Sequence, residues 1–412
     1  MDKKSQVQKP TSNAVSWGVF FATVEIVLIS ITSVVFPALV VRSASRIVDN
    51  TINPWETGVW AFPLILTNLI LLGIGIAYYK KKLPSIIIKS IQFIFNFEVS
   101  KKIAFITMAV LLAIYIPLSI GELSQDEGKV WEDYVAVKKS ADEWSIDKVT
   151  QGFDLHFRFF LLSSSIQLFD NIRVIPFIVS ICLLVLTYFI TLELSHKRFA
   201  GLVAFVILLQ SPVFLEYDTT ATYENVWTIM YILSLYVIYK AWPVSPLSYI
   251  LSLLSKQLTV IFLPMTLFFI YRADVPKKRK TRTFISYMII LVMGIIAITV
   301  FKVSLGQFTV EYFDLYFWQG FTSMAYQLRF DFLVLIFLLP LTIGLFFASR
   351  RGILQADSVM VLIAGILFSA PLLTGFTTLT NQPYRYVPLV IFFAMGVGVI
   401  LSKRKQKVTG QA

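Results

Sequence analysis

Long apolar runs, separated by short polar stretches, follow one another along almost the whole chain. Most runs have about 17 to 25 residues, the length that an α-helix needs to cross a hydrocarbon core. The pattern predicts an all-α polytopic membrane protein with about twelve transmembrane helices, and it leaves no room for a separate soluble domain. We place the helices at residues 17–41, 57–79, 103–120, 172–193, 199–215, 225–240, 246–257, 259–272, 283–303, 330–348, 355–374 and 385–401.

Four segments do not fit a simple spanning helix. Lys256 interrupts the apolar run 246–272, which predicts either two short helices or one long tilted helix. Segment 84–98 is too short and polar to span and has lysines on both sides, so we expect an interfacial helix. The stretch 121–156, after the third helix, is a large outer loop with nine of the 24 acidic residues, and the aromatic-rich stretch 304–329 suits a membrane interface.

The charge distribution sets the expected orientation. The chain is 57% hydrophobic and only 15% charged, with a net charge of +12. With both termini inside, the inner segments hold 24 of the 36 basic residues and five acids, whereas the outer segments hold 12 bases and 18 acids. This bias predicts cytoplasmic termini, most simply in a plasma membrane, and it explains the basic clusters as topology signals rather than nucleic-acid sites.

Ionisable side chains gather at the predicted outer boundary of the membrane. Charges at this depth are costly and usually face a cavity or a partner. Carboxylates can accept a proton from an acceptor group, and Arg or Lys can hold a phosphate as it gains charge. These groups include Asp126, Glu127, His156, Arg158, Arg173, Glu216, Asp218, Glu224, Lys256, Arg329 and Arg385.

Short motifs occur at these positions in a fixed order. They are Ser-Gln-Asp126-Glu127 after helix 103–120, His156-Phe-Arg-Phe-Phe with Asn-Ile-Arg173-Val-Ile-Pro176, Ser211-Pro212 running through Asp218 to Glu224, Leu-Ser-Lys256-Gln-Leu with Leu-Pro264, and Pro383-Tyr384-Arg385-Tyr-Val-Pro388. From about residue 103 to 401 this set resembles the GT-C superfamily of membrane glycosyltransferases, in the branch of protein O-mannosyltransferases and lipid A aminoarabinose transferases. His156 departs from the family pattern because two prolines do not follow it, and Glu224 stands where the family has Asp.

The resemblance implies a specific organisation and chemistry. Residues 103–401 would form a GT-C-like catalytic core, 1–102 a two-helix N-terminal extension and 402–412 a basic cytoplasmic tail. A sugar on a polyprenyl phosphate would move to a protein, lipid or glycan acceptor on the outer face. The implied catalytic residues are Asp126, Glu127 and Glu224, and the implied substrate-binding residues are His156, Arg173, Lys256, Tyr384 and Arg385.

No protein metal site or organic cofactor is expected, although the reaction could still use a divalent cation. The chain has no Asp-x-Asp, P-loop or Gly-x-Gly-x-x-Gly motif, which argues against nucleotide-sugar, ATP-driven and dinucleotide chemistry. Two alternatives remain. Twelve helices also suit a secondary transporter, although no internal repeat is evident, and the chain could be a non-catalytic membrane subunit.

Overall fold

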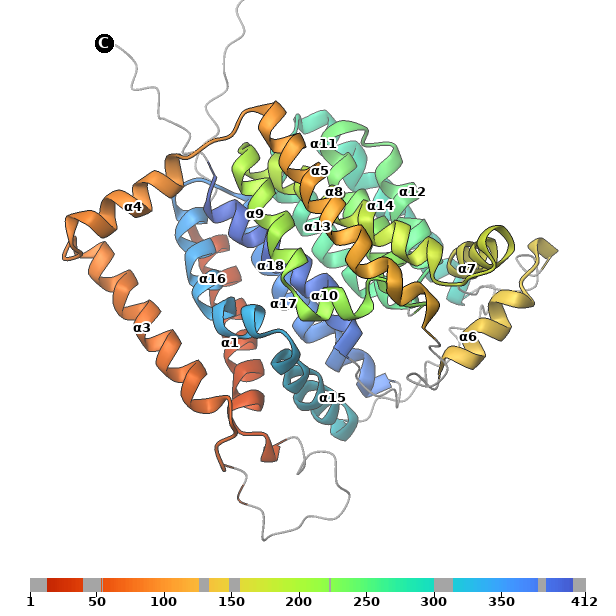
Figure 1. Ribbon diagram of the computed structural model, residues 1–412, viewed down its shortest axis with the longest axis horizontal. Helices are drawn as coiled ribbons and strands as arrows, with labels where there is room; N and C mark the ends of the chain where they lie inside the picture. The colour runs from red at the N-terminus through yellow and green to blue at the C-terminus, as the bar shows by residue number, and fades with distance from the viewer. Residues whose placement is uncertain are drawn as a thin grey trace, which may run out of the picture.

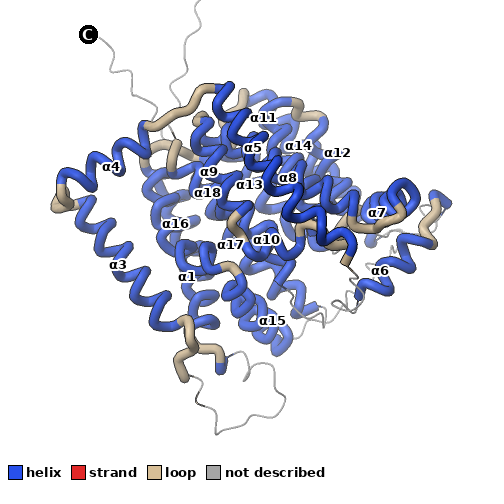
Figure 2. The backbone as a smooth tube through the Cα atoms, viewed as in Figure 1, coloured by secondary structure: helices blue, strands red, loops and turns tan. Residues whose placement is uncertain are grey.

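The computed structural model describes residues 13–39, 53, 55–125, 133–147, 156–221, 224–299, 314–376 and 383–402. Within these ranges every regular element is a helix and no strand occurs (Figure 2). The all-α prediction is therefore confirmed for the described part of the chain. Asp126 and Glu127 lie outside it.

The helices follow the predicted apolar runs closely. The elements that correspond to predicted helices are α1 (Asn13–Val35), α3 (Ala61–Tyr79), α4 (Ser85–Asn96), α5 (Lys101–Ile120), α8 (Val174–Ser195), α9 (Arg198–Leu209), α10 (Pro212–Tyr217), α11 (Glu224–Lys240), α12 (Val244–Leu253), η4 (Gln257–Phe262), α13 (Leu263–Arg272), α14 (Lys277–Thr299), α16 (Phe332–Arg350), α17 (Gln355–Phe376), η6 (Pro383–Tyr386) and α18 (Val387–Ile400). Two helices, α6 (Asp133–Asp142) and α7 (His156–Phe169), lie in segments without a helix prediction. A third, α15 (Asp314–Tyr326), lies within the predicted interfacial stretch 304–329.

Several of these helices are suited to a membrane. Six described helices are long and apolar enough to cross one: Ala14–Val35, Ala61–Tyr79, Lys101–Ser124, Val174–Ser195, Phe332–Arg350 and Pro383–Ile400. Exposed apolar side chains cover one face of α5, including Ile103, Ile106, Val110, Ile114 and Leu118. A soluble protein rarely exposes such a surface, whereas lipid covers it at no cost. The chain is therefore membrane-embedded.

Two breaks in the helices have local causes. The predicted helix 199–215 is divided because Ser211 caps a new helix and Pro212 occupies its first turn. Proline lacks an N–H group and is favoured at that position. In the run 246–272, Lys256 has an extended backbone between α12 and η4, so the two-helix alternative describes the structure. Both breaks lie at the same end of the bundle.

We call that end the site end, and the end with Asn13 and Ser402 the termini end (Figure 1). Helices α8, α11 and α18 begin at the site end and finish at the termini end. The amphipathic helix α4, predicted as interfacial, has no buried residue and lies at the margin of the bundle with α3 (Figure 1).

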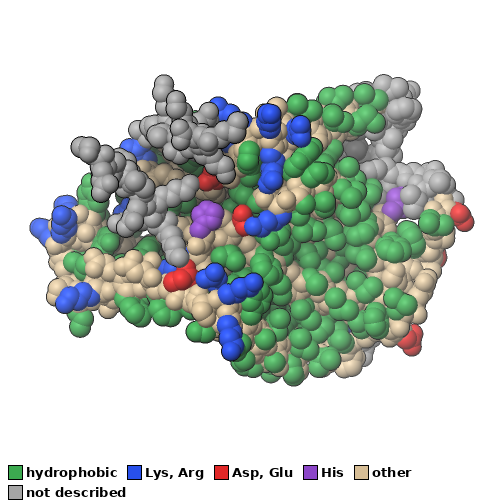
Figure 3. Space-filling model, turned by 90° about the horizontal axis from the view of Figure 1, so that it is seen from above, with side chains coloured by type: hydrophobic (Ala, Val, Ile, Leu, Met, Phe, Trp, Pro, Cys, Tyr) green, Lys and Arg blue, Asp and Glu red, His purple; other side chains and the backbone are tan. Residues whose placement is uncertain are grey.

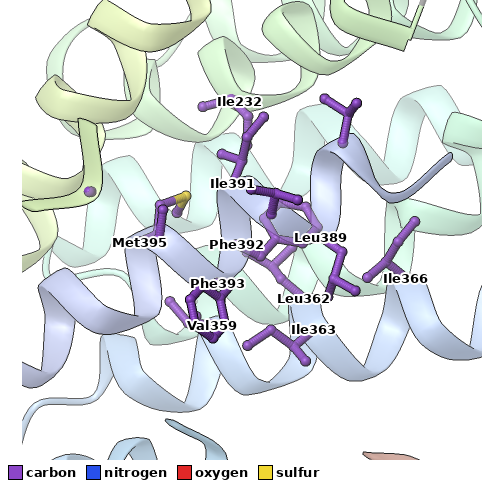
Figure 4. Packing of buried hydrophobic residues seen from close by; sticks show 14 of the residues in the cluster. Ile232, Val359, Leu362, Ile363, Ile366, Leu389, Ile391, Phe392, Phe393 and Met395 are labelled. Carbon is purple, nitrogen blue, oxygen red and sulfur yellow. The ribbon is translucent and has the colours of Figure 1, made fainter. Parts of the chain in front are cut away.

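Helix α18 forms the centre of the core. It packs against α8, α9, α11, α16 and α17, and its side chains Leu389, Ile391, Phe392 and Met395 interlock with those of α11 and α17 (Figure 4). A β-carbon at Gly398 would collide with Thr191 of α8. Glycine is needed here because it lets two membrane helices approach closely.

Helix α1 is part of this bundle, since it packs against α15, α16 and α17. The Ser16 hydroxyl donates to the Asp357 carboxylate at 2.9 Å and lies 2.9 Å from the Ser349 hydroxyl. The Arg272 guanidinium forms an ion pair with the same carboxylate, and both side chains are buried. This network joins α1, α13, α16 and α17 at the termini end. The proposed boundary at residue 102 stays a prediction.

The buried ion pair gives a stability prediction. Replacing Asp357 by Asn would leave the Arg272 charge buried without a counter-ion, which costs about 3–5 kcal/mol. The matched control is Glu193→Gln, because Glu193 pairs with Lys240 at 2.5 Å with side chains 23% and 51% exposed, and such pairs contribute about 0–1 kcal/mol. Thermal unfolding in detergent should show a large loss for Asp357→Asn and little change for Glu193→Gln. Equal losses in the two variants would contradict the assigned role of the network.

Candidate functional site

Three of the predicted site residues meet at the site end. Lys256 Nζ forms an ion pair with Glu224 Oε1, and their side chains are 12% and 0% exposed. Tyr384, also buried, lies with its ring centroid 5.7 Å from Lys256 Nζ. These residues come from the start of α11, the break before η4, and η6, which are far apart in the sequence.

Trp227 completes the surroundings of the lysine. Its indole Nε1 donates to Glu224 Oε2, and its ring centroid lies 5.7 Å from Lys256 Nζ. The ammonium group is thus held by one carboxylate and two aromatic faces. Cation–π contacts of this kind add about 0.5–2 kcal/mol as desolvation increases.

The local sequence explains why these groups point into one place. Glu224 is the first residue of α11, where the helix dipole favours an acidic side chain. Lys256 adopts φ −157° and ψ 119°, an extended conformation that separates two short helices. Tyr384 belongs to the short 3-10 turn η6 that leads into α18, and its ring meets that of Tyr217 in α10 edge-on at 5.7 Å.

Two further basic side chains act on the pair. Arg385 and Arg158 both interact electrostatically with Lys256. Arg158 lies in the first turn of α7, is 4% exposed and stacks on Phe159 at 4.7 Å. Lys256 pairs with Glu224, and Arg158 and Arg385 lie close enough to act on the lysine. A group of basic side chains of this kind suits an anion, above all a phosphate.

Arg173 performs a different task in the structure. Its Nη1 donates to the Gln125 carbonyl at 3.0 Å, and its Nε and Nη2 donate to the Thr219 carbonyl at 3.0 Å and the Thr219 hydroxyl at 2.7 Å. The Thr219 hydroxyl in turn donates to Glu122 Oε2 at 2.9 Å. Arg173 thus clamps the start of the outer loop to the turn after α10, and its predicted substrate contact stays a prediction.

The remaining predicted residues are less closely connected to Lys256. His156 is half-buried at the first position of α7, two residues before Arg158. Asp126 and Glu127 lie outside the described residues, directly after the clamped Gln125. Within the described ranges, no group of three His, Cys, Asp or Glu side chains could hold a metal ion. Whether the reaction uses a divalent cation stays a separate question.

Asp218, which the sequence places at the outer boundary without a predicted role, is a further candidate. It is fully buried, and its Oδ2 accepts from the Tyr115 hydroxyl at 2.5 Å and the Ser119 hydroxyl at 3.2 Å. Its Oδ1 is buried with no hydrogen-bond partner among the described residues. An unsatisfied buried carboxylate oxygen is costly and marks a site to which a further donor can bind.

Two features of the sequence were available to find it. Asp218 is the acidic residue of the Ser211-Pro212 motif itself, and it follows an apolar segment at the predicted membrane boundary. The resemblance gives it no role, because Glu224, six residues later, stands at the second acidic position of the family motif. Only the structure shows that Asp218 is buried against α5.

Burial has a direct effect on this carboxyl group. Burial raises the pKa of Asp218 from 3.8 to about 7. The hydrogen bond from Tyr115 lowers the pKa, and the negative charge of Glu122 raises it further. Asp218 lies in the turn after α10, outside the six candidate spans. The group therefore titrates close to neutral pH.

Comparison with known proteins identified no relative. No family model, no curated protein and no solved structure matches the chain.

The shifted pKa predicts a pH-dependent stability. Between pH 3.8 and about 7 the folded state binds the Asp218 proton more tightly than the unfolded state, so this group's contribution to stability is lost as the pH rises through about 7. Asp218→Asn imitates the protonated form and removes the effect. The melting temperature of the wild type, relative to Asp218→Asn, should fall by several degrees between pH 5 and pH 8. A constant difference over this range would contradict the assignment, and the exposed Asp142→Asn serves as the control.

Proposed function

We propose that this chain is a membrane glycosyltransferase of the GT-C type, which moves a sugar from a polyprenyl-phosphate donor to an acceptor. The observation that carries the proposal is the convergence of Glu224, Lys256 and Tyr384 at one end of the bundle. Each belongs to a different motif of the resemblance, and the three motifs meet at one place in the bundle.

The charge of the cluster supports a phosphate-bearing donor. Lys256, Arg158 and Arg385 would hold the donor phosphate, and Glu224 with Trp227 would keep the lysine in position. A long isoprenoid chain has to stay in the bilayer, so its phosphate lies at the membrane boundary. The exposed apolar surface of the neighbouring helices suits that arrangement.

The proposed reaction is a direct displacement. Asp126, or Glu127, accepts the proton of the acceptor hydroxyl as its oxygen attacks the anomeric carbon. The bond between that carbon and the phosphate oxygen breaks, and polyprenyl phosphate leaves with the electron pair. The cations stabilise the negative charge that develops on the leaving group, and the anomeric configuration inverts.

The Arg173 clamp supports the assignment of Asp126 as the base. It fixes the carbonyl of Gln125, the residue before Asp126, beside the turn that holds Asp218. A fixed anchor next to a catalytic carboxylate favours a defined geometry, which general-base catalysis requires.

We further propose about twelve spans, with the termini end in the cytoplasm of a plasma membrane. Apart from the interfacial α4, the described residues contain four shorter apolar helices in addition to the six longer ones. The basic residues of the sequence concentrate in the segments assigned to the termini end, as the positive-inside rule requires. Cysteines placed at Asp142 and Lys278 in a Cys182→Ser background report the orientation. An impermeant maleimide that labels Lys278→Cys in intact cells would contradict it.

A transfer assay tests the function. Protein in native-like lipid is supplied with radiolabelled polyprenyl-phosphate mannose or glucose, with total membrane extract as acceptor. We expect label transfer by the wild type and a loss of about 100-fold or more in Asp126→Asn, because general-base catalysis contributes about 10²–10⁴-fold. The exposed Asp142→Asn, in the same outer loop, should retain activity.

Two outcomes would contradict the proposal. Folded protein that transfers no sugar from any donor would favour a secondary transporter or a non-catalytic subunit, in which Glu224 and Lys256 form a structural pair. Equal activity of Asp126→Asn and the wild type would remove the acidic pair from the reaction.

A further inference from the structure

A large cavity lies at the termini end, on the opposite side of the bundle from Lys256. Its volume is about 870 Å³. Its walls come from the ends of α8, α13, α16 and α18, the beginnings of α14 and α17, and helix α4. The proposed transfer reaction uses none of these residues, so the cavity needs a separate explanation.

The cavity combines apolar walls with an excess of positive charge. Phe95, Leu194 and Phe347 contribute apolar surface. Four Lys or Arg side chains line it, namely Arg272, Lys277, Lys280 and Arg351, against one carboxylate, Asp274. Figure 3 looks onto this end from above and shows Lys and Arg side chains gathered beside a broad hydrophobic surface.

The role of Arg272 is already assigned, because it forms the buried ion pair with Asp357. Three basic side chains therefore remain against one acid. Lys280 is half-buried, and its ammonium group donates to the Tyr271 carbonyl at 2.8 Å. The Asp274 carboxylate interacts electrostatically with Lys280, so Lys277 and Arg351 add two further positive charges to the lining. This net positive charge suits an anionic ligand.

One wall of the cavity is fixed at the level of the membrane surface. Lys197 Nζ donates to the carbonyls of Ile94 and Phe95 at the end of α4, at 3.1 and 2.9 Å. Glu98 Oε1 accepts from the backbone N–H of Arg198 at 3.1 Å. These contacts attach α4 to the turn between α8 and α9. Since α4 is an exposed amphipathic helix next to two spanning helices, it lies in the interface plane.

A basic pocket between membrane helices at headgroup depth is the arrangement that binds anionic lipid headgroups. The apolar walls accommodate the beginning of the acyl chains, and the cations accommodate the phosphate. We propose that this cavity binds the phosphate-bearing headgroup of an anionic membrane lipid, with Lys280 and Arg351 as its principal charged contacts. This site is independent of the proposed transfer reaction.

A pair of matched double variants tests the proposal. Lys280→Gln with Arg351→Gln removes two charges from the cavity. Lys278→Gln with Arg350→Gln removes two charges from neighbouring exposed positions that do not line it. Purified full-length protein is titrated with phosphatidylglycerol in a phosphatidylcholine background, and the bound lipid is measured by native mass spectrometry. The melting temperature of each variant confirms that it is folded.

We expect the wild type to bind phosphatidylglycerol in preference to phosphatidylcholine. The cavity variant should bind phosphatidylglycerol roughly 30-fold more weakly than the wild type, because each of the two basic side chains contributes about 1 kcal/mol and about 1.4 kcal/mol corresponds to a tenfold change in affinity. The matched variant should stay within about threefold of the wild type. Equal weakening in both variants, or none in either, would overturn the proposal. A large excess of inorganic phosphate should leave the lipid bound, and complete displacement would assign the cavity to a soluble phosphate compound instead.

Discussion

A charge buried in or beside a membrane is costly unless another group pairs with it, and this constraint governs both ends of the bundle. At the site end Lys256 is paired with Glu224, and at the termini end Arg272 is paired with Asp357. Each pair joins helices that are distant in the sequence. Because an unpartnered buried charge is so costly, these two contacts determine which helices meet, and the apolar core around α18 fills the space between them.

Further basic side chains lie near each pair, with different consequences. At the site end these are Arg158 and Arg385, which act on Lys256. At the termini end they line a cavity bounded by an interfacial helix. The two proposed anion-binding regions therefore rest on the same principle, although they would bind ligands for different purposes.

The sequence predicted the helices well because apolar length is a strong signal: α5, α8 and α17 begin or end within two residues of their predicted limits. It also selected Glu224, Lys256 and Tyr384 as candidate site residues through the motif resemblance, and the structure brings these three side chains together. Their mutual contacts could not be predicted, since helix packing is not encoded in any local pattern. Asp218 received no role because the motif resemblance assigned the acidic position to Glu224. Arg173 was selected by motif although its hydrogen bonds hold the loop. Helices α6, α7 and α15 are less apolar than the spanning helices, so length and hydropathy did not reveal them.

The central claim is that the Lys256 cluster binds the phosphate of a polyprenyl-phosphate donor, and the binding of polyprenyl phosphate itself tests it most directly. The informative variant combines Glu224→Gln with Lys256→Met, which removes the pair without leaving a lone buried charge. Its control combines Glu193→Gln with Lys240→Met, an ion pair at the opposite end of the same helix α11. The account predicts that the first variant binds polyprenyl phosphate at least about tenfold more weakly than the wild type, because a charge-assisted hydrogen bond contributes about 1.5–3 kcal/mol, and that the second binds it equally well. Unchanged binding in the first variant, with the protein folded, would contradict the claim.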